Sequence, residues 1–152
     1  MTKRSRVLGK SGDNLRNGRR LKAMWESLAS ERFDPSALWK RVGGDMQLLS
    51  ELVQIFVAEY PELLLQIDAA VRDGNADGLR KASHKLKGSL LQFSAPMASH
   101  AAADLENLAA GNFLKNATSS VERVKMEINS LVRLLEAMVS SGEARANKAG
   151  EI

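Results

Sequence analysis

Hydrophobic positions recur every three to four residues along most of the chain, the spacing that places side chains on one face of an α-helix. The clearest case is near the C-terminal end, where apolar residues step alternately by three and four: Val121, Val124, Ile128, Leu131, Leu135 and Met138. This pattern predicts a helix of about 24 residues, with Asn116 as a cap before it and Gly142 just beyond its end. From Gly142 onward, small and charged residues predict a frayed tail.

Two helices are predicted in the first half of the chain. Asp34-Pro35 is typical of a helix start, with a cap followed by proline at the first helical position, and that short helix stops at Gly43-Gly44. Asp45 then caps a longer helix, which Pro61 either kinks or restarts. The helix ends at the turn Gly74-Asn75.

Two more helices follow, one from about Ala76 to Phe93 and one from about Met97 to Ala110, separated by Ser94-Ala95-Pro96. Residues 21–28 offer one further amphipathic turn at the front. Short connections favour antiparallel neighbours. The predicted fold is therefore all-α, an up-and-down antiparallel four-helix bundle with a short extra N-terminal helix.

Composition narrows the function classes. The 152 residues suffice for one domain with a real core, and 44% of them are hydrophobic. The absence of cysteine excludes disulfides, thiolate catalysis and sulfur-ligated metals, and is compatible with the reducing cytoplasm, where we expect the protein. The apolar runs are too short for a membrane span, and no apolar stretch follows the basic N-terminus as in a secretory signal.

The net charge of +4 is unevenly distributed. Residues 1–22 hold eight Lys and Arg against Asp13 alone, giving +7, while the remainder carries −3. Such a basic arm can touch nucleic acid or an anionic membrane, and it is more simply explained as a linker or a cloning remnant. No aromatic residue interleaves the first 24 residues, so base stacking has little support.

The helix at 76–93 is the most informative about function. One narrow sector, its predicted buried stripe, holds Leu79, Ser83, Leu86, Leu90 and Phe93. With Leu79 as zero, His84 lies at about 140° around the axis, far from that stripe. The solvent-facing sector also carries Lys81, Lys87, Gly88 and Leu91.

These neighbours give His84 a chemical context that a lone surface histidine lacks. Lys87, one turn on, can place its ammonium near an anion carried by the ring. Gly88 costs about 1 kcal/mol relative to alanine inside a helix, a cost often accepted where another molecule approaches the backbone closely. Leu91 is an apolar residue on the same exposed side, which suggests a docking surface.

The run Ser83-His84-Lys85-Leu86-Lys87-Gly88-Ser89 resembles the phosphoacceptor motif of histidine-containing phosphotransfer (HPt) domains, His-x-Leu-Lys-Gly-Ser. The resemblance extends over about Phe33 to Met138, through the following residues: Phe33-Asp34, Val42-Gly43-Gly44-Asp45, Phe56, Pro61, Leu63-Leu64, Gly74-Asn75, Leu79, Ala102 and Leu105-Glu106. Two positions depart from the family pattern. Ser83 replaces the usual alanine before the histidine, and Ser94-Ala95 replaces Gly-Ala, which makes helix packing at that turn less certain.

The charge pattern predicts a basic arm or linker at 1–30, with room for a partly helical segment, and composition predicts a flexible tail at 141–152, while the resemblance implies an HPt bundle at 31–140. The resemblance also implies that His84 accepts a phosphoryl group from a receiver-domain aspartate and passes it to another receiver, with Lys87 and Gly88 beside it. Lys81, Lys85, Leu91 and Gln92 are the expected docking residues. The chain would be a phosphocarrier, not an enzyme, with no cofactor or metal of its own, Mg²⁺ being expected in the receiver.

The implied partners are response-regulator receivers and a sensor or hybrid histidine kinase, of which this chain can itself be a piece. Two alternatives stay open. One is a structural interaction bundle whose histidine motif has lost its role. The other is a nucleic-acid-binding protein using the basic arm, although no nucleic-acid partner and no membrane insertion are expected. No glycine-rich nucleotide loop supports an autonomous kinase, and His84 and His100 lack metal-ligand spacing.

Overall fold

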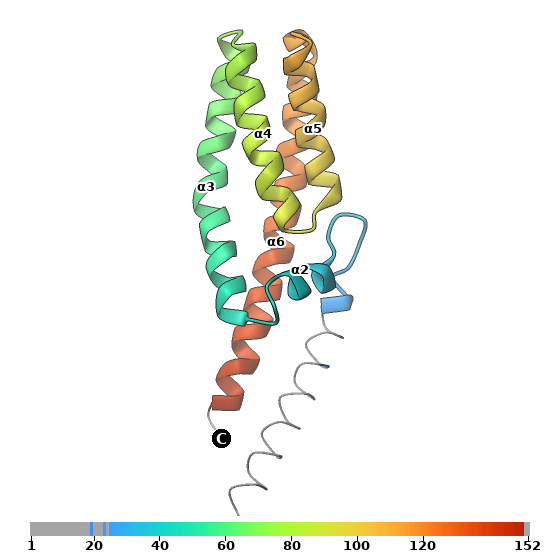
Figure 1. The fold of residues 1–152 in the computed structure, drawn as a ribbon, viewed down its shortest axis with the longest axis vertical. Coiled ribbons are helices and arrows are strands. Elements are labelled where there is room, and N and C mark those ends of the chain that lie inside the picture. The colour runs from blue at the N-terminus through green and yellow to red at the C-terminus, as the bar shows by residue number, and fades with distance from the viewer. Residues whose placement is uncertain (1–18, 20–22, 24, 151–152) are drawn as a thin grey trace, which may run out of the picture.

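The computed structural model describes residues 19, 23 and 25–150, and for residues 143–150 it gives the backbone alone. The elements within this part of the chain are α2 (Pro35–Arg41), α3 (Met46–Arg72), α4 (Ala76–Gln92), α5 (Pro96–Ala110), the 3₁₀ turn η1 (Leu114–Asn116) and α6 (Ala117–Gly150). Helices α3 to α6 run up and down in turn to form a four-helix bundle, and α2 lies across the end at which α4 turns into α5 (Figure 1). The predicted all-α bundle with a short extra helix is confirmed.

The four long helices form a closed ring. Each packs against two others, in the order α3, α4, α5, α6 and back to α3. Because α4 and α5 are joined by a short turn and pack closely along their length, residues at similar distances from that turn lie level with each other. This register determines what can face the exposed side of α4.

Side-chain caps define three of the helix starts, and those at Asp34 and Asp45 were predicted from the sequence, whereas Asn75 was predicted only as part of a turn. The side-chain oxygens of Asp34, Asp45 and Asn75 accept hydrogen bonds from the third following backbone N–H, at 3.0, 3.0 and 2.9 Å. Each cap satisfies a donor that has no partner inside its own helix. The start of α4 is therefore fixed by Asn75.

The core confirms the predicted stripe on α4. Leu79, Ser83, Leu86, Leu90 and Phe93 are all buried there, and Ala82 joins them. The largest fully buried side chains come from every long helix and from the segment before α3: Trp25, Phe33, Leu38, Leu49, Ile67, Leu79, Leu86, Leu90, Leu105, Ile128, Leu131 and Leu135. Burying one face of α4 leaves the opposite face to solvent.

The ends of the chain differ from the sequence prediction. The last helix does not stop near Gly142 but continues to Gly150, so most of the predicted tail at 141–152 is helical. Pro61 does not restart a helix, because α3 is continuous through it. Of the predicted turn at 21–28, Trp25 is buried with its ring 4.8 Å from that of Trp39, while Leu21 and Met24 lie outside the described residues.

The basic arm at 1–22 lies outside the described residues except for Arg19. No helix within the described part of the chain combines the length and apolar character needed to cross a membrane.

Helix α2 is tied to the C-terminal end of α4 by two contacts. The backbone N–H of Asp34 donates to the carbonyl of Ser94 at 3.1 Å, and Arg41 Nη1 donates to the carbonyl of Leu91 at 2.6 Å. Ser94 itself has a φ of 54°, in the left-handed region that favours glycine. Ser94, which stands where the family usually has glycine, therefore adopts a backbone conformation that suits glycine better than serine.

Replacing Ser94 by glycine should stabilise the protein by roughly 1 kcal/mol, because glycine adopts a positive φ without the Cβ clash. Urea denaturation of the two proteins measures the difference. Asn112→Gly is the matched control, since Asn112 also has a positive φ (59°) but asparagine tolerates it better, so its gain should be smaller. If Ser94→Gly had the same free energy of unfolding as the parent protein, the serine at this turn would not be strained.

Candidate functional site

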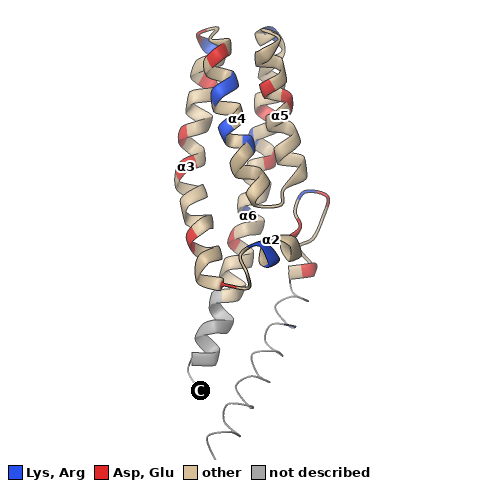
Figure 2. Ribbon diagram, viewed as in Figure 1, with Lys and Arg blue, Asp and Glu red and all other residues tan. Residues whose placement is uncertain are grey.

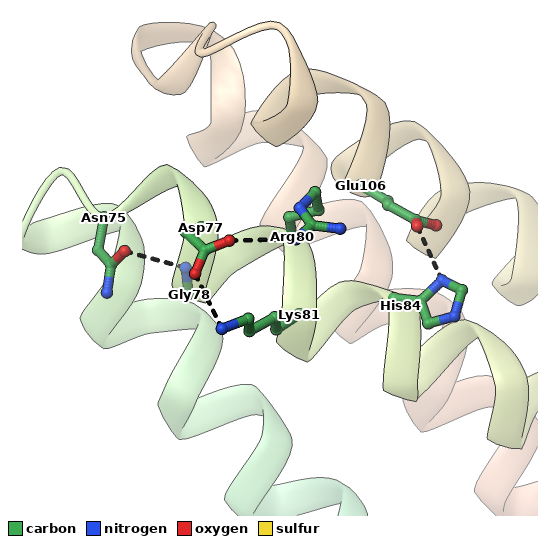
Figure 3. A network of polar contacts seen from close by, with 7 residues as sticks. All are labelled: Asn75, Asp77, Gly78, Arg80, Lys81, His84 and Glu106. Carbon is green, nitrogen blue, oxygen red and sulfur yellow. Dashed lines mark hydrogen bonds and ion pairs between the residues drawn. The ribbon is translucent and has the colours of Figure 1, made fainter.

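His84 lies on the exposed face of α4, and one of its two ring nitrogens is engaged. Its side chain is 68% exposed, and its Nδ1 lies 2.8 Å from Oε1 of Glu106 on α5 (Figure 3). The contact crosses between two neighbouring helices, so it orients the ring relative to the bundle. The other ring nitrogen, Nε2, has no hydrogen-bond partner among the described residues.

The second oxygen of Glu106 binds a cation. Oε2 lies 2.6 Å from Nζ of Lys87, and both side chains are partly buried, at 18% and 28% exposure. One carboxylate thus joins the ring of His84 to the ammonium of Lys87. The Lys87 contact is the main cause that holds the pKa of Glu106 below its ordinary value, against an opposing effect of burial, and the His84 contact adds to the lowering.

An ionised Glu106 determines the protonation pattern of the ring. A carboxylate can only accept hydrogen bonds, so a neutral His84 facing it must carry its proton on Nδ1. The lone pair is then on Nε2, which faces away from Glu106 (Figure 3). In this tautomer the accessible nitrogen is the nucleophilic one.

Gly88 follows His84 by one turn, and packing inside the molecule does not explain it. A Cβ built on Gly88 meets nothing within 4 Å, and the residue is exposed. Glycine in a helix interior costs about 1 kcal/mol of stability relative to alanine. Gly88 therefore weakens α4, and no contact among the described residues requires a glycine there. The space above it is available to another molecule.

The remaining predicted residues lie around this site in different ways. Leu91 is 54% exposed, and Lys85 and Gln92 are also exposed on α4. Lys81 is held elsewhere, because its Nζ lies 3.0 Å from Oδ2 of Asp77. The structure therefore brings Lys87 to His84 through Glu106 but does not bring Lys81 there.

Ser83 and Ser89, the two serines of the motif, take no part in the exposed site. Ser83 is fully buried, and its hydroxyl has no hydrogen-bond partner within the described residues. Ser89 donates a hydrogen bond from its hydroxyl to the backbone carbonyl of Lys85 at 3.3 Å.

Glu106 was missed as a functional residue by the sequence analysis, although it was part of the family resemblance. The sequence feature that could have identified Glu106 is its distance from the α4–α5 turn. His84 and Glu106 lie at similar separations from Ser94 on either side, so an antiparallel hairpin sets them level. Arg80, one turn before His84, was also not selected as a functional residue.

Among the described residues, no group of three or more His, Asp or Glu side chains is placed to hold a metal ion. Glu106 is a single carboxylate beside the ring, and it already binds a lysine.

A comparison with protein-family models gives a match to the Hpt domain over residues 51–141, more than half of the chain. The chain belongs to the Hpt domain family. Membership assigns it a histidine phosphotransfer role in a phosphorelay, with two-component proteins as partners. Hpt domains are phosphocarriers rather than catalysts.

A solved structure supports the fold of this Hpt domain. Histidine-containing phosphotransfer protein B (HptB) from Pseudomonas aeruginosa PAO1 superposes with a TM-score of 0.70 at 22% sequence identity, covering 74% of this chain and 97% of that one. None of the curated proteins compared with the chain matches it.

The bridge from Lys87 to Glu106 predicts a pH-dependent contribution to stability. Because the pKa of Glu106 is lowered in the folded protein, its contribution is fully present above the ordinary value of 4.5 and is lost as the pH falls below it. Glu106→Gln should therefore cost about 1 kcal/mol at neutral pH and progressively less in acid.

Denaturation curves of wild type and Glu106→Gln between pH 3 and pH 7 measure this difference. Glu62→Gln, on an exposed position of α3, is the control and should show little effect at any pH. A cost of Glu106→Gln that stays constant down to pH 3 would show that the carboxylate charge does not contribute.

Proposed function

We propose that His84 is the phosphoacceptor of this Hpt domain, taking a phosphoryl group from the aspartate of one receiver domain and passing it to the aspartate of another. The observation that carries the proposal is the geometry of the ring: His84 is 68% exposed, and Glu106 holds its Nδ1 at 2.8 Å. Nε2 is thereby presented to an incoming partner as a nucleophile.

The transfer step follows from this tautomer. Nε2 attacks the phosphorus, the N–P bond forms, and the bond from phosphorus to the receiver's carboxyl oxygen breaks, releasing the aspartate carboxylate. The ring becomes positively charged as its lone pair is used, and its proton stays on Nδ1. Glu106 accepts the hydrogen bond from that N–H and offsets the new charge.

Lys87 has two effects in this scheme. Its ammonium, 2.6 Å from Glu106, favours the ionised carboxylate that orients the ring. It also lies one helical turn from His84, where it offsets negative charge on the phosphoryl oxygens. Phosphoryl transfer depends mainly on such positioning and charge stabilisation.

The charge of α4 suits an acidic partner site. Helix α4 contains one arginine and three lysines against Asp77, whereas the neighbouring α3 contains four acidic residues against Arg72. Figure 2 shows basic residues along α4 and mainly acidic ones along α3. A receiver domain presents a phosphoaspartate, so complementary charge favours its approach to α4.

The proposed docking surface is the exposed face of α4 around the ring. Gly88 admits the receiver backbone, Leu91 supplies an apolar contact, and Lys85 and Gln92 supply polar ones at the edge. Lys81 has a weaker claim, because it lies about 60° around α4 from His84, on the side away from Lys87, and contacts Asp77. Mg²⁺ would be bound by the receiver, and a sensor or hybrid histidine kinase in the cytoplasm would supply the phosphoryl group.

Incubation with a phosphorylated receiver domain tests the proposal. Wild type should gain one acid-labile phosphoryl group, about 80 Da by intact mass, whereas His84→Gln should gain none. His100→Gln, at the chain's other histidine, is exposed on α5 and should behave as wild type. Labelling that survives in His84→Gln but disappears in His100→Gln would contradict the assignment.

If a panel of phosphorylated receivers leaves the wild type unmodified, His84 is not a working acceptor. The bundle would then serve as a non-phosphorylatable interaction module.

A further inference from the structure

Arg80 shares a narrow face of α4 with the proposed phosphoacceptor. Arg80, His84, Lys87 and Leu91 follow one another at spacings of four, three and four residues. At 100° per residue, all four fall within a sector of about 60°. Lys81 and Lys85 lie outside this sector. They are at about 60° and 100° around the axis from His84, on the side opposite to Arg80 and Lys87.

In the unphosphorylated protein, Arg80 makes a weak and exchangeable ion pair with Asp77. Its Nη2 lies 3.1 Å from Oδ1 of Asp77, with the two side chains 49% and 63% exposed (Figure 3). Exposed ion pairs of this kind contribute little to stability. Asp77 would not be left unpaired without Arg80, because its other oxygen binds Lys81 at 3.0 Å.

We infer that Arg80 is a second cation for phosphorylated His84, its guanidinium leaving Asp77 to donate hydrogen bonds to the phosphoryl oxygens. The inference rests on the proposed role of His84 and extends that site by one residue. It concerns the phosphorylated state, in which a group carrying up to two negative charges is added to the ring.

Arg80 is suited to this role by its position on the helix and because, unlike Lys87, it is not held in a partly buried ion pair. Side chains four residues apart on a helix are neighbours, so the guanidinium can reach a group on the ring of His84. Lys87 is partly buried and bound to Glu106 at 2.6 Å, and releasing it would take the cation away from one oxygen of a carboxylate that is 18% exposed. Arg80 has no such restraint, and its planar fork of donors matches phosphoryl oxygens in pairs.

The charged groups around the phosphoryl group would be Arg80, Lys81 and Lys87 on α4 and Glu106 on α5. A cation in contact with the phosphoryl oxygens favours their doubly ionised form. Arg80 should therefore lower the second pKa of the phosphohistidine and shift the transfer equilibrium with a receiver towards His84.

Phosphoramidate phosphorylates histidine chemically without a protein partner, so the full-length chain can be loaded directly and titrated by ³¹P NMR. Arg80→Gln should raise the second pKa of the phosphohistidine by roughly half a unit, and Arg80→Lys should restore part of the shift. Lys81→Gln removes the same charge from the neighbouring position and is the matched control, for which a clearly smaller change is expected.

A second readout is the equilibrium constant for transfer from a phosphorylated receiver. Arg80→Gln should lower it about two- to fivefold, the range expected for an exposed ion pair. Equal effects of Arg80→Gln and Lys81→Gln, or no effect of Arg80→Gln, would overturn the inference while leaving His84 as the acceptor. If transfer from phosphorylated receivers gives no phosphohistidine in wild type, or gives it equally in His84→Gln, the proposed function falls and this inference with it.

Discussion

The carboxylate of Glu106 joins the two residues on which the site depends. One of its oxygens lies 2.8 Å from Nδ1 of His84 and the other 2.6 Å from Nζ of Lys87. A bridging carboxylate of this kind is effective only when it is ionised, and the Lys87 contact lowers its pKa accordingly. The orientation of the ring, the position of its proton and the availability of Nε2 all follow from this contact.

The bundle supports the bridge by fixing the register of α4 against α5. The cap at Asn75 starts α4, and the short turn at Ser94 sets where α5 begins relative to it. Helix α2 secures this turn through the bonds from Asp34 to Ser94 and from Arg41 to the carbonyl of Leu91. The strain of a serine at positive φ is thus located next to the element that sets the register of the site.

Features that depend on local spacing were predictable from the sequence. The caps at Asp34 and Asp45 depend on a side chain and a backbone amide three residues apart, and both were predicted. Asn75 was predicted only as part of a turn, and the structure shows that its side chain also caps α4. The buried stripe of α4 follows from helical periodicity, and the same projection placed His84 on the opposite face. The family resemblance then added the chemistry to that exposed position.

Contacts between helices were not predictable in the same way. The bond from Glu106 to His84 depends on how α4 and α5 are aligned, and periodicity within one helix carries no information about that. Lys81 was expected at the docking surface because it lies in the solvent-facing sector of α4, but its ammonium contacts Asp77 and does not reach the bridge at Glu106. The last helix continues past Gly142 because a single glycine only weakens a helix and does not stop it.

Measuring the tautomer of unphosphorylated His84 tests whether Glu106 presents Nε2 as the nucleophilic nitrogen. Long-range ¹H–¹⁵N spectra of the neutral imidazole rings distinguish the protonated nitrogen from the one carrying the lone pair. With His84→Gln used to assign the signals, the account predicts a proton on Nδ1 and a lone pair on Nε2 in the wild type, and loss of this preference in Glu106→Gln. A ring protonated mainly on Nε2 in the wild type would contradict it, because the accessible nitrogen would then not be the nucleophile.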